Sequence, residues 1–276
     1  NIKYLLFRIT IKIRTKMSIN PNASQTSRNL ALILLNKKFW IAHFLIVVAI
    51  SVAGLIYLGG ATYTGAPPLV DFKSPAGETV ISRSLIKSGE EVFHLRGLMS
   101  YGSFWGDGAD RGPDFTADAL HRTIVSMQSF YENEIGDNVV SQYDKDAIAT
   151  RVQREVHTNT WDEESGLISI NAAQVHAFQE LNDHYTRMFT DPEYPELFQI
   201  GYITEPEDIT ALTAFFYWGG WVSAANRPGE DYSYTHNWPY DPQAGNTPTT
   251  ATYIWSVISI FGLFLGIGLV LYVYGK

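Results

Sequence analysis

Two long stretches without charge bracket this chain, and every acidic residue lies between them. No charged side chain occurs in 39–70 or in 242–275, while all 28 Asp and Glu fall within 71–241. Residues 1–38 carry eight Lys and Arg and no acid, whereas 71–241 carry eleven Lys and Arg, which gives this middle part a net charge of −17. Because basic segments stay on the cytoplasmic side of a membrane, the pattern predicts two spans that hold an acidic domain on the outer face.

Both charge-free stretches are long enough to cross a bilayer. We expect transmembrane helices at 39–58 and 252–274, since about 20 apolar residues match a hydrocarbon core of about 30 Å. A signal peptide is the alternative for the first stretch, but its apolar run is longer than a typical signal and no clean cleavage motif follows. We therefore predict a multi-pass protein of the inner membrane, with a cytoplasmic N-terminus at 1–38 and a periplasmic domain at 59–250.

The composition excludes several kinds of site. The chain contains no Cys, so it can form neither a disulfide nor the thioether bonds of a c-type haem, and it has no thiolate for a metal. Its acidic balance argues against nucleic acid as a partner, because that affinity comes from Lys and Arg on phosphates. The first Met is Met17, and we interpret 1–16 as upstream sequence that is not translated.

The outer domain is expected to be mainly α-helical with minor β structure. Residues 59–80 are rich in Gly and Pro and indicate an extended linker. Apolar periodicity predicts helices at 84–99, 117–133, 144–156, 171–188 and about 204–226, and a strand at 166–170. Candidate caps are Thr116 or Asp114 for the second of these helices, Asn171 for the fourth, and a capping box of Thr204 and Glu207 for the last.

Three acid and imidazole side chains recur at helical spacing in the fourth of these helices. His176, Glu180 and His184 follow one another at intervals of four residues, so all three could share one face. Two imidazoles and a carboxylate could hold zinc or iron. The alternative is an ordinary polar stripe, which we favour because the HExxH spacing of a zinc protease helix is absent.

Other polar and aromatic residues stand out less sharply. His43 lies inside the first span and could ligate a haem, although it is close enough to the inner boundary to reach water. His94, His121 and His157 are isolated and are expected to have packing or surface roles. The aromatic residues of the tail favour a membrane-interface belt over a ligand cage; they are Tyr232, Tyr234, Trp238 and Tyr240.

Three ordered blocks of the sequence resemble a single family. They are GEEVFHLRGLMSYGSFWGDGADRGPDFTADALHR at 89–122, NTWDEESGLISI at 159–170, and SAANRPGEDYSYTHNWPYDPQAGNTPTT at 223–250. They are similar to the N-terminal region of the single-subunit, quinol-dependent nitric oxide reductases of the haem–copper oxidase superfamily. The resemblance implies a membrane helix followed by a periplasmic domain of cytochrome c fold that holds no haem.

The resemblance also assigns roles to particular positions. The helix that carries Gly89 and Phe93 looks like the first helix of a cytochrome c, and 98–102 stand where a haem-binding CxxCH would follow. The two-subunit relatives bind calcium partly through carbonyls of a glycine-rich loop, and this match marks Gly108 and Asp110 as possible calcium ligands. Asp110 replaces a residue that is usually aromatic in those relatives.

The family's catalytic machinery is expected downstream of this region. It comprises b-type haems, a non-haem iron and nearby glutamates in a helical bundle that would begin with the second span. The chain ends at Lys276, so we expect an N-terminal fragment or a split subunit that is inactive by itself and needs the bundle, membrane lipid and quinol. Two alternatives stay open, namely the related nitric oxide dismutases and a non-enzymatic sensor or binding ectodomain.

Overall fold

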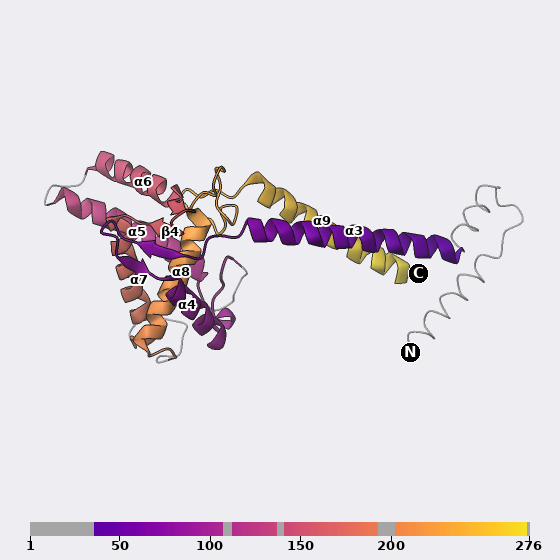
Figure 1. Cartoon of the computed structure of the whole chain (residues 1–276), viewed down its shortest axis with the longest axis horizontal. Helices are drawn as coiled ribbons and strands as arrows, with labels where there is room; N and C mark the ends of the chain where they lie inside the picture. Colours follow the sequence, from indigo (N-terminus) through magenta and orange to yellow (C-terminus); the bar gives the residue numbers. More distant parts are fainter. Residues whose placement is uncertain (1–35, 107–111, 137–140, 193–201, 275–276) are drawn as a thin grey trace, which may run out of the picture. The chain divides into compact units, whose positions relative to one another are not determined.

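The computed structural model describes residues 36–106, 112–136, 141–192 and 202–274. By its internal contacts the chain divides into two units, 1–66 and 67–276, and each is described by itself. Figure 1 shows the elements in order along the chain. The chain is mainly α-helical with a small sheet, and one apolar helix precedes the central domain in the sequence while another follows it, as the sequence predicts.

The first unit is built around one long helix, α3 (Lys37–Thr64). Asn36 caps its N-terminus by accepting a hydrogen bond from the backbone of Lys38. The helix extends six residues beyond the expected boundary at residue 58, because Gly59 and Gly60 continue it rather than opening a linker. Glycine is common in helices that lie in lipid, where no water competes for the backbone.

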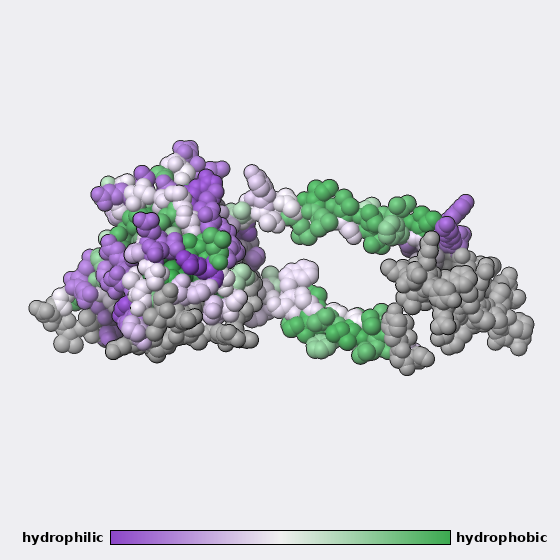
Figure 2. Space-filling view, turned by 90° about the horizontal axis from the view of Figure 1, so that it is seen from below, coloured by the Kyte–Doolittle hydropathy of each residue, from purple (hydrophilic) through white to green (hydrophobic). Residues whose placement is uncertain are grey.

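The second unit ends in another apolar helix, α9 (Thr250–Tyr274). α3 and α9 are both long and apolar enough to cross a membrane, and their side chains are exposed. On the face shown in Figure 2, hydrophobic residues cover most of both long helices, whereas many hydrophilic residues lie on the surface of the domain. Such exposed apolar helices are unfavourable in water, so their composition indicates a membrane-anchored protein.

A four-stranded sheet occupies part of the stretch expected to be a linker, which corrects that prediction. The strands are β1 (Asp71–Lys73), β2 (Thr79–Ile81), β3 (Trp161–Asp162) and β4 (Leu167–Ser169), in the order β2-β1-β4-β3. β1 pairs in parallel with β4, and the other two pairs are antiparallel. The buried residues Phe72, Ile81 and Ile168 face one another across the central strands, and this burial explains why so short a sheet is stable.

Five α-helices account for most of the remaining residues of the domain that the structure describes, and local caps explain where most of them begin. Ser82 caps the first and Asp114 the second, whereas Ser141 and Asn171 each form a capping box. The helices are α4 (Arg83–Leu95), α5 (Phe115–Ile135), α6 (Gln142–His157), α7 (Ala172–Thr190) and α8 (Pro206–Ala224).

One predicted helix end and one predicted cap are wrong. The first helix ends at Leu95 rather than near residue 99, because Gly97 adopts a left-handed conformation (φ 61°) and a short 3-10 turn, η1 (Leu98–Ser100), follows. The expected capping box of Thr204 and Glu207 does not form. The N-cap is Glu205, which makes no side-chain cap, and Pro206 supplies the first helical position, which suits its fixed φ.

The core gathers around α8, which is buried along nearly its whole length. This helix packs against α4, α5 and α7, and Figure 1 shows it running among them. Because α8 is apolar on all faces, it behaves as a central core helix rather than an amphipathic surface helix.

Candidate cofactor site

The candidate site lies at the end of α4, where the resemblance places the haem attachment motif. α4 crosses α8 at Gly89, and an added Cβ there would lie 2.0 Å from the carbonyl oxygen of Ala211 and 2.8 Å from the Cβ of Phe215. No side chain fits at such distances, so glycine is what allows the two helices to touch. Phe93 lies one turn further along the same face and is buried beneath this crossing.

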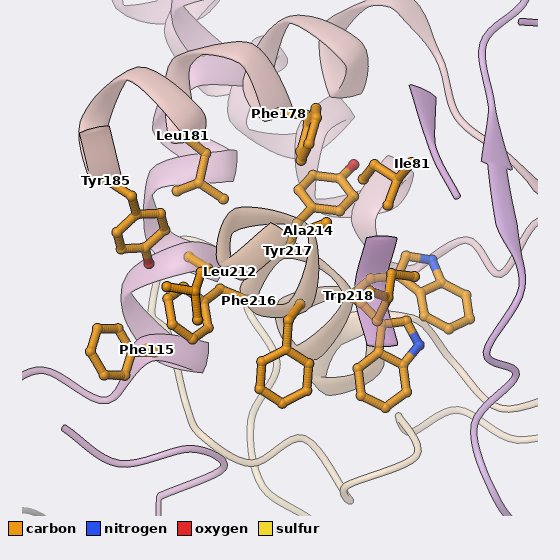
Figure 3. Close-up of a cluster of buried hydrophobic side chains, with 14 of the residues drawn as sticks. Ile81, Phe115, Phe178, Leu181, Tyr185, Leu212, Ala214, Phe216, Tyr217 and Trp218 are labelled. Atoms are coloured by element: carbon orange, nitrogen blue, oxygen red, sulfur yellow. The ribbon is translucent and has the colours of Figure 1, made fainter. Parts of the chain in front are cut away.

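Aromatic rings fill the space around Phe93. Phe104 stacks on Phe215 with ring centroids 4.4 Å apart, and Phe115 stacks on Phe216 at 4.5 Å, each pair inclined by only 6°. Phe93 contacts all four rings at centroid distances of 5.7–5.9 Å. In Figure 3, Phe115 and Phe216 lie close to Tyr185 within this core. Stacked and edge-on contacts of this kind are favourable for aromatic rings, so these side chains hold one another in place.

Residues 98–102, which stand in the place of CxxCH, are constrained by the packing of this core. Leu98, in the place of the first cysteine, is fully buried among apolar neighbours. Gly102 stands where the axial histidine would be, and an added Cβ would lie 2.4 Å from the ring of Phe115 and 2.5 Å from the carbonyl oxygen of Pro113. No imidazole can occupy that position without moving α5. The residues present therefore do not fit a covalently attached haem, for reasons of space as well as of missing thiols.

The glycine-rich loop next to this core contains the two possible calcium ligands. Gly108 and Asp110 lie outside the described residues, so the calcium hypothesis stays a prediction. The ends of the loop are held by Asp114, whose carboxylate accepts hydrogen bonds from the hydroxyl of Ser103 (2.7 Å) and from the backbone nitrogens of Gly106 (2.6 Å) and Ala117 (2.8 Å). This carboxylate both caps α5 and fastens the two ends of the loop.

The row of His176, Glu180 and His184 does lie on one helix, α7, but its members have different surroundings. His176 packs against the ring of Phe130, Glu180 is exposed, and His184 is buried with its Nε2 3.4 Å from Asp118. Among the described residues, no three His, Asp or Glu side chains are arranged to hold a metal ion. The row is therefore a polar stripe beside α5.

Asp118 is the centre of the buried polar cluster at this stripe. It accepts hydrogen bonds from Tyr185 Oη (3.0 Å) and Arg122 Nε (2.8 Å) and lies beside His184. Burial raises the pKa of Asp118, but polar contact with His184 and the charge of Arg122 outweigh it and hold the pKa below its usual value. The cluster joins α5 to α7 with a carboxylate that stays ionised at neutral pH.

Two histidines fix the tail of the domain to its helices. Both ring nitrogens of His157 lie within hydrogen-bond distance of carbonyl oxygens, 3.0 Å from Ala224 and 2.9 Å from Ala244. His121 Nδ1 lies 2.8 Å from the carboxylate of Asp241. We expect packing or surface roles for both from the sequence. Their partners are not predictable in this way, because they lie 67 to 120 residues away and no local spacing indicates them.

His43, the intramembrane candidate, is bonded within its own helix. Its Nδ1 lies 2.8 Å from the carbonyl oxygen of Phe39, and its ring lies on that of Phe39 with centroids 3.9 Å apart. Both contacts are local features of α3. Histidines that bind a metal commonly donate their other ring N–H to a backbone carbonyl, so this geometry leaves the haem-ligand alternative a prediction.

The family model of the NorB cytochrome c-like domain, from nitric oxide reductase, matches residues 70–240. The matched range begins just before β1 and ends at the aromatic tail, so it covers the helices and sheet described above. No curated protein matches the chain at a significant level.

Proposed function

Since the chain belongs to the family of NorB cytochrome c-like domains of nitric oxide reductase, we propose that it is the N-terminal part of a membrane nitric oxide reductase that reduces NO to N2O with quinol as electron donor. The proposed enzyme takes two NO, two electrons and two protons to N2O and water. A quinol supplies both the electrons and the protons when it is oxidised to quinone, so the reaction balances without a further donor.

The observation that carries the choice of donor is the filled core at Gly102. A cytochrome c domain normally relays electrons through its haem, but here the position of the axial ligand has no space for a side chain and the chain has no Cys. A donor that passes electrons through this domain would need a haem attached to it, and these residues offer no place for one. Quinol dissolved in the bilayer needs no such relay, so the domain serves as a structural element beside the electron path.

The same proposal places the domain on the periplasmic side of the inner membrane. The support is the charge pattern, with eight basic residues and no acid before α3 ends and a net charge of −17 within 71–241. Basic segments resist translocation, so α3 would run outward from a cytoplasmic N-terminus and α9 would return inward. The proposed partners are membrane lipid and quinol. Nucleic acid is not among them, because the domain is strongly acidic.

We propose that α9 begins the catalytic bundle and that the metal centres of the bundle lie outside residues 1–276. In that bundle, b-type haems and a non-haem iron would supply the redox chemistry, and calcium is a further possible cofactor near Gly108 and Asp110. His43 is the one histidine within α3 and α9, and several imidazoles are needed to ligate such centres. We therefore expect residues 1–276 by themselves to be inactive.

The identity of the gaseous product tests this function. Anaerobic membranes that contain the protein with everything encoded downstream in its reading frame are given isotopically labelled NO and a reduced quinol, and the gases are analysed by mass spectrometry. Labelled N2O is the expected product. Dinitrogen together with oxygen would instead identify a dismutase, and no turnover by haem-loaded protein would leave the sensor or binding ectodomain. Expression of residues 1–276 alone is the matched control.

A further inference from the structure

The aromatic residues of the tail separate into two pairs in the structure. Tyr232 stacks on His236 with ring centroids 4.5 Å apart, and Tyr234 packs against Trp221 and accepts a hydrogen bond from Asn159. These two tyrosines belong to the body of the domain. Trp238 and Tyr240 project instead, with 42% and 48% of their surface exposed. The four-residue belt expected from the sequence is therefore reduced to two candidates, and no cage of aromatic walls is formed by these four residues.

Hydrogen bonds place Trp238 beside the start of α9. The backbone nitrogen of Thr249, the last residue before that helix, donates to the carbonyl oxygen of His236 (3.3 Å), and its hydroxyl lies 3.2 Å from His236 Nδ1. The side-chain amide of Asn237 donates to the carbonyl oxygen of Thr247 (2.9 Å). Trp238 is two residues after His236, and two residues span at most about 7 Å. The backbone of Trp238 therefore lies close to the first turn of α9.

The turn that carries the two aromatic residues is held firmly. Asn246 is fully buried, and its amide donates to the carbonyl oxygen of Pro239 (2.8 Å) and accepts from the backbone of Asp241 (2.8 Å). The indole of Trp238 lies against Gly106, where an added Cβ would come within 2.1 Å of Nε1. Trp238 and Tyr240 are thus presented by a pre-formed turn, and little conformational entropy is lost when they contact a partner.

We infer that Trp238 and Tyr240 form an interfacial anchor that inserts into the lipid headgroup layer where α9 enters the membrane, an inference that rests on the proposed span of α9. Trp and Tyr have an apolar ring and a polar tip, which suits the boundary between headgroups and hydrocarbon. Tyr253 and Trp255, exposed on the first turns of α9, lie at the same end of the helix. No charged side chain occurs from 242 to 275, and Asp241, next to Tyr240, is buried with its carboxylate 2.8 Å from His121.

The absence of Cys from the chain makes a direct test possible. The full chain is reconstituted in liposomes as the single variants Trp238→Cys and Tyr240→Cys, each carrying a nitroxide spin label, and collisions with oxygen and with a water-soluble nickel chelate are measured. Tyr143→Cys, on α6 and 88% exposed, is the water-facing control, and Leu263→Cys, on α9 and 62% exposed, is the lipid-facing control. The oxygen-to-nickel accessibility ratio at 238 and 240 should exceed that at 143 by about threefold or more, as expected at a membrane interface.

Each other outcome overturns the anchor. If the label at 263 is immersed in lipid while those at 238 and 240 behave like the label at 143, the anchor is wrong although the span stands. If labels at 238 and 240 are shielded from both reagents, a protein surface covers them instead of lipid. If the label at 263 itself is open to the nickel chelate, the proposed membrane span fails together with the anchor. Quenching of native fluorescence by brominated lipid, reduced in Trp238→Phe, is the second measurement should a labelled variant fold poorly.

Discussion

Two glycines of the cytochrome c-like core occupy positions where the packing leaves no space for a side chain. Gly89 lets α4 and α8 touch, and Gly102 leaves no room where a haem protein needs its axial histidine. Neither requirement is visible as a pattern, since both depend on a neighbour far away in sequence, Ala211 in one case and Phe115 in the other. The resemblance drew attention to both positions, but only the packing explains why a side chain is excluded.

Substitution of Gly89 should weaken the domain strongly. In Gly89→Ala the added methyl group meets the backbone of Ala211, which cannot move aside as a side chain could, and such overpacking costs about 3 kcal/mol. Thermal unfolding of the purified chain, followed by circular dichroism, measures the loss. The matched control is Gly59→Ala in α3, where no atom lies within 4 Å of the added Cβ and no loss is expected. Equal melting temperatures for both variants would contradict the close crossing.

Asp118 should make the stability of the domain depend on pH in a defined direction. Its pKa is lowered in the folded protein, so its ionised form contributes stability that is complete at neutral pH and is lost as acid protonates it. Asp118→Asn should therefore lower the melting temperature by about 5 °C at pH 7. The difference between the two proteins should shrink as the pH falls below about 4. Asp183→Asn, exposed on the neighbouring helix α7, should show neither effect, and a pH-independent difference would refute the role of the charge.

At the scale of elements, local signals predicted the helices well and the sheet poorly. Caps such as Asp114 and Asn171 lie within a few residues of the apolar stripe of their helices, so the sequence shows both signals together. The strands are two or three residues long, which is too short for alternation to be seen. The central pairing of β1 with β4 joins residues that are far apart in the sequence, as Phe72 and Ile168 are. Pro206 likewise replaced an expected capping box, because a fixed φ starts a helix as well as a side chain does.

The aromatic stack around Phe93 should be the largest single source of stability in the domain. Phe93→Ala removes the ring that contacts four others and leaves a cavity among rings that cannot collapse, at a cost of about 4 kcal/mol. Chemical unfolding followed by tryptophan fluorescence checks this value. Tyr143→Ala, an exposed aromatic substitution on α6, should change stability by no more than about 0.5 kcal/mol. A small effect at Phe93 would show that the stack is not the core of the fold.

At the scale of the whole molecule, charge alone predicted two spans and an intervening domain. The two apolar helices and the mostly helical, cytochrome c-like domain agree with that prediction. The candidate calcium ligands Gly108 and Asp110 stay a prediction, because they lie outside the described residues. The filled core was beyond the reach of sequence reasoning, since it needs the relative positions of Phe104, Phe115 and Phe215.

The orientation of the domain can be tested on intact cells. If the −17 region faces the periplasm, protease added to spheroplasts should cleave within 71–241 and leave the basic N-terminus attached to the membrane. A tag fused ahead of the first span should resist the same treatment until the membrane is permeabilised. Protection of the domain together with cleavage of the N-terminus would reverse the proposed topology.

The choice of electron donor tests the central claim most directly, because the absence of Cys and the filled core at Gly102 leave no place for a covalently attached haem in this domain. The purified full-length protein of the same locus is supplied anaerobically with NO and either a reduced quinol or a reduced c-type cytochrome. We predict NO consumption with quinol and none above background with the cytochrome. Comparable turnover with the cytochrome, together with a haem that stays bound to the polypeptide after denaturation, would contradict this account.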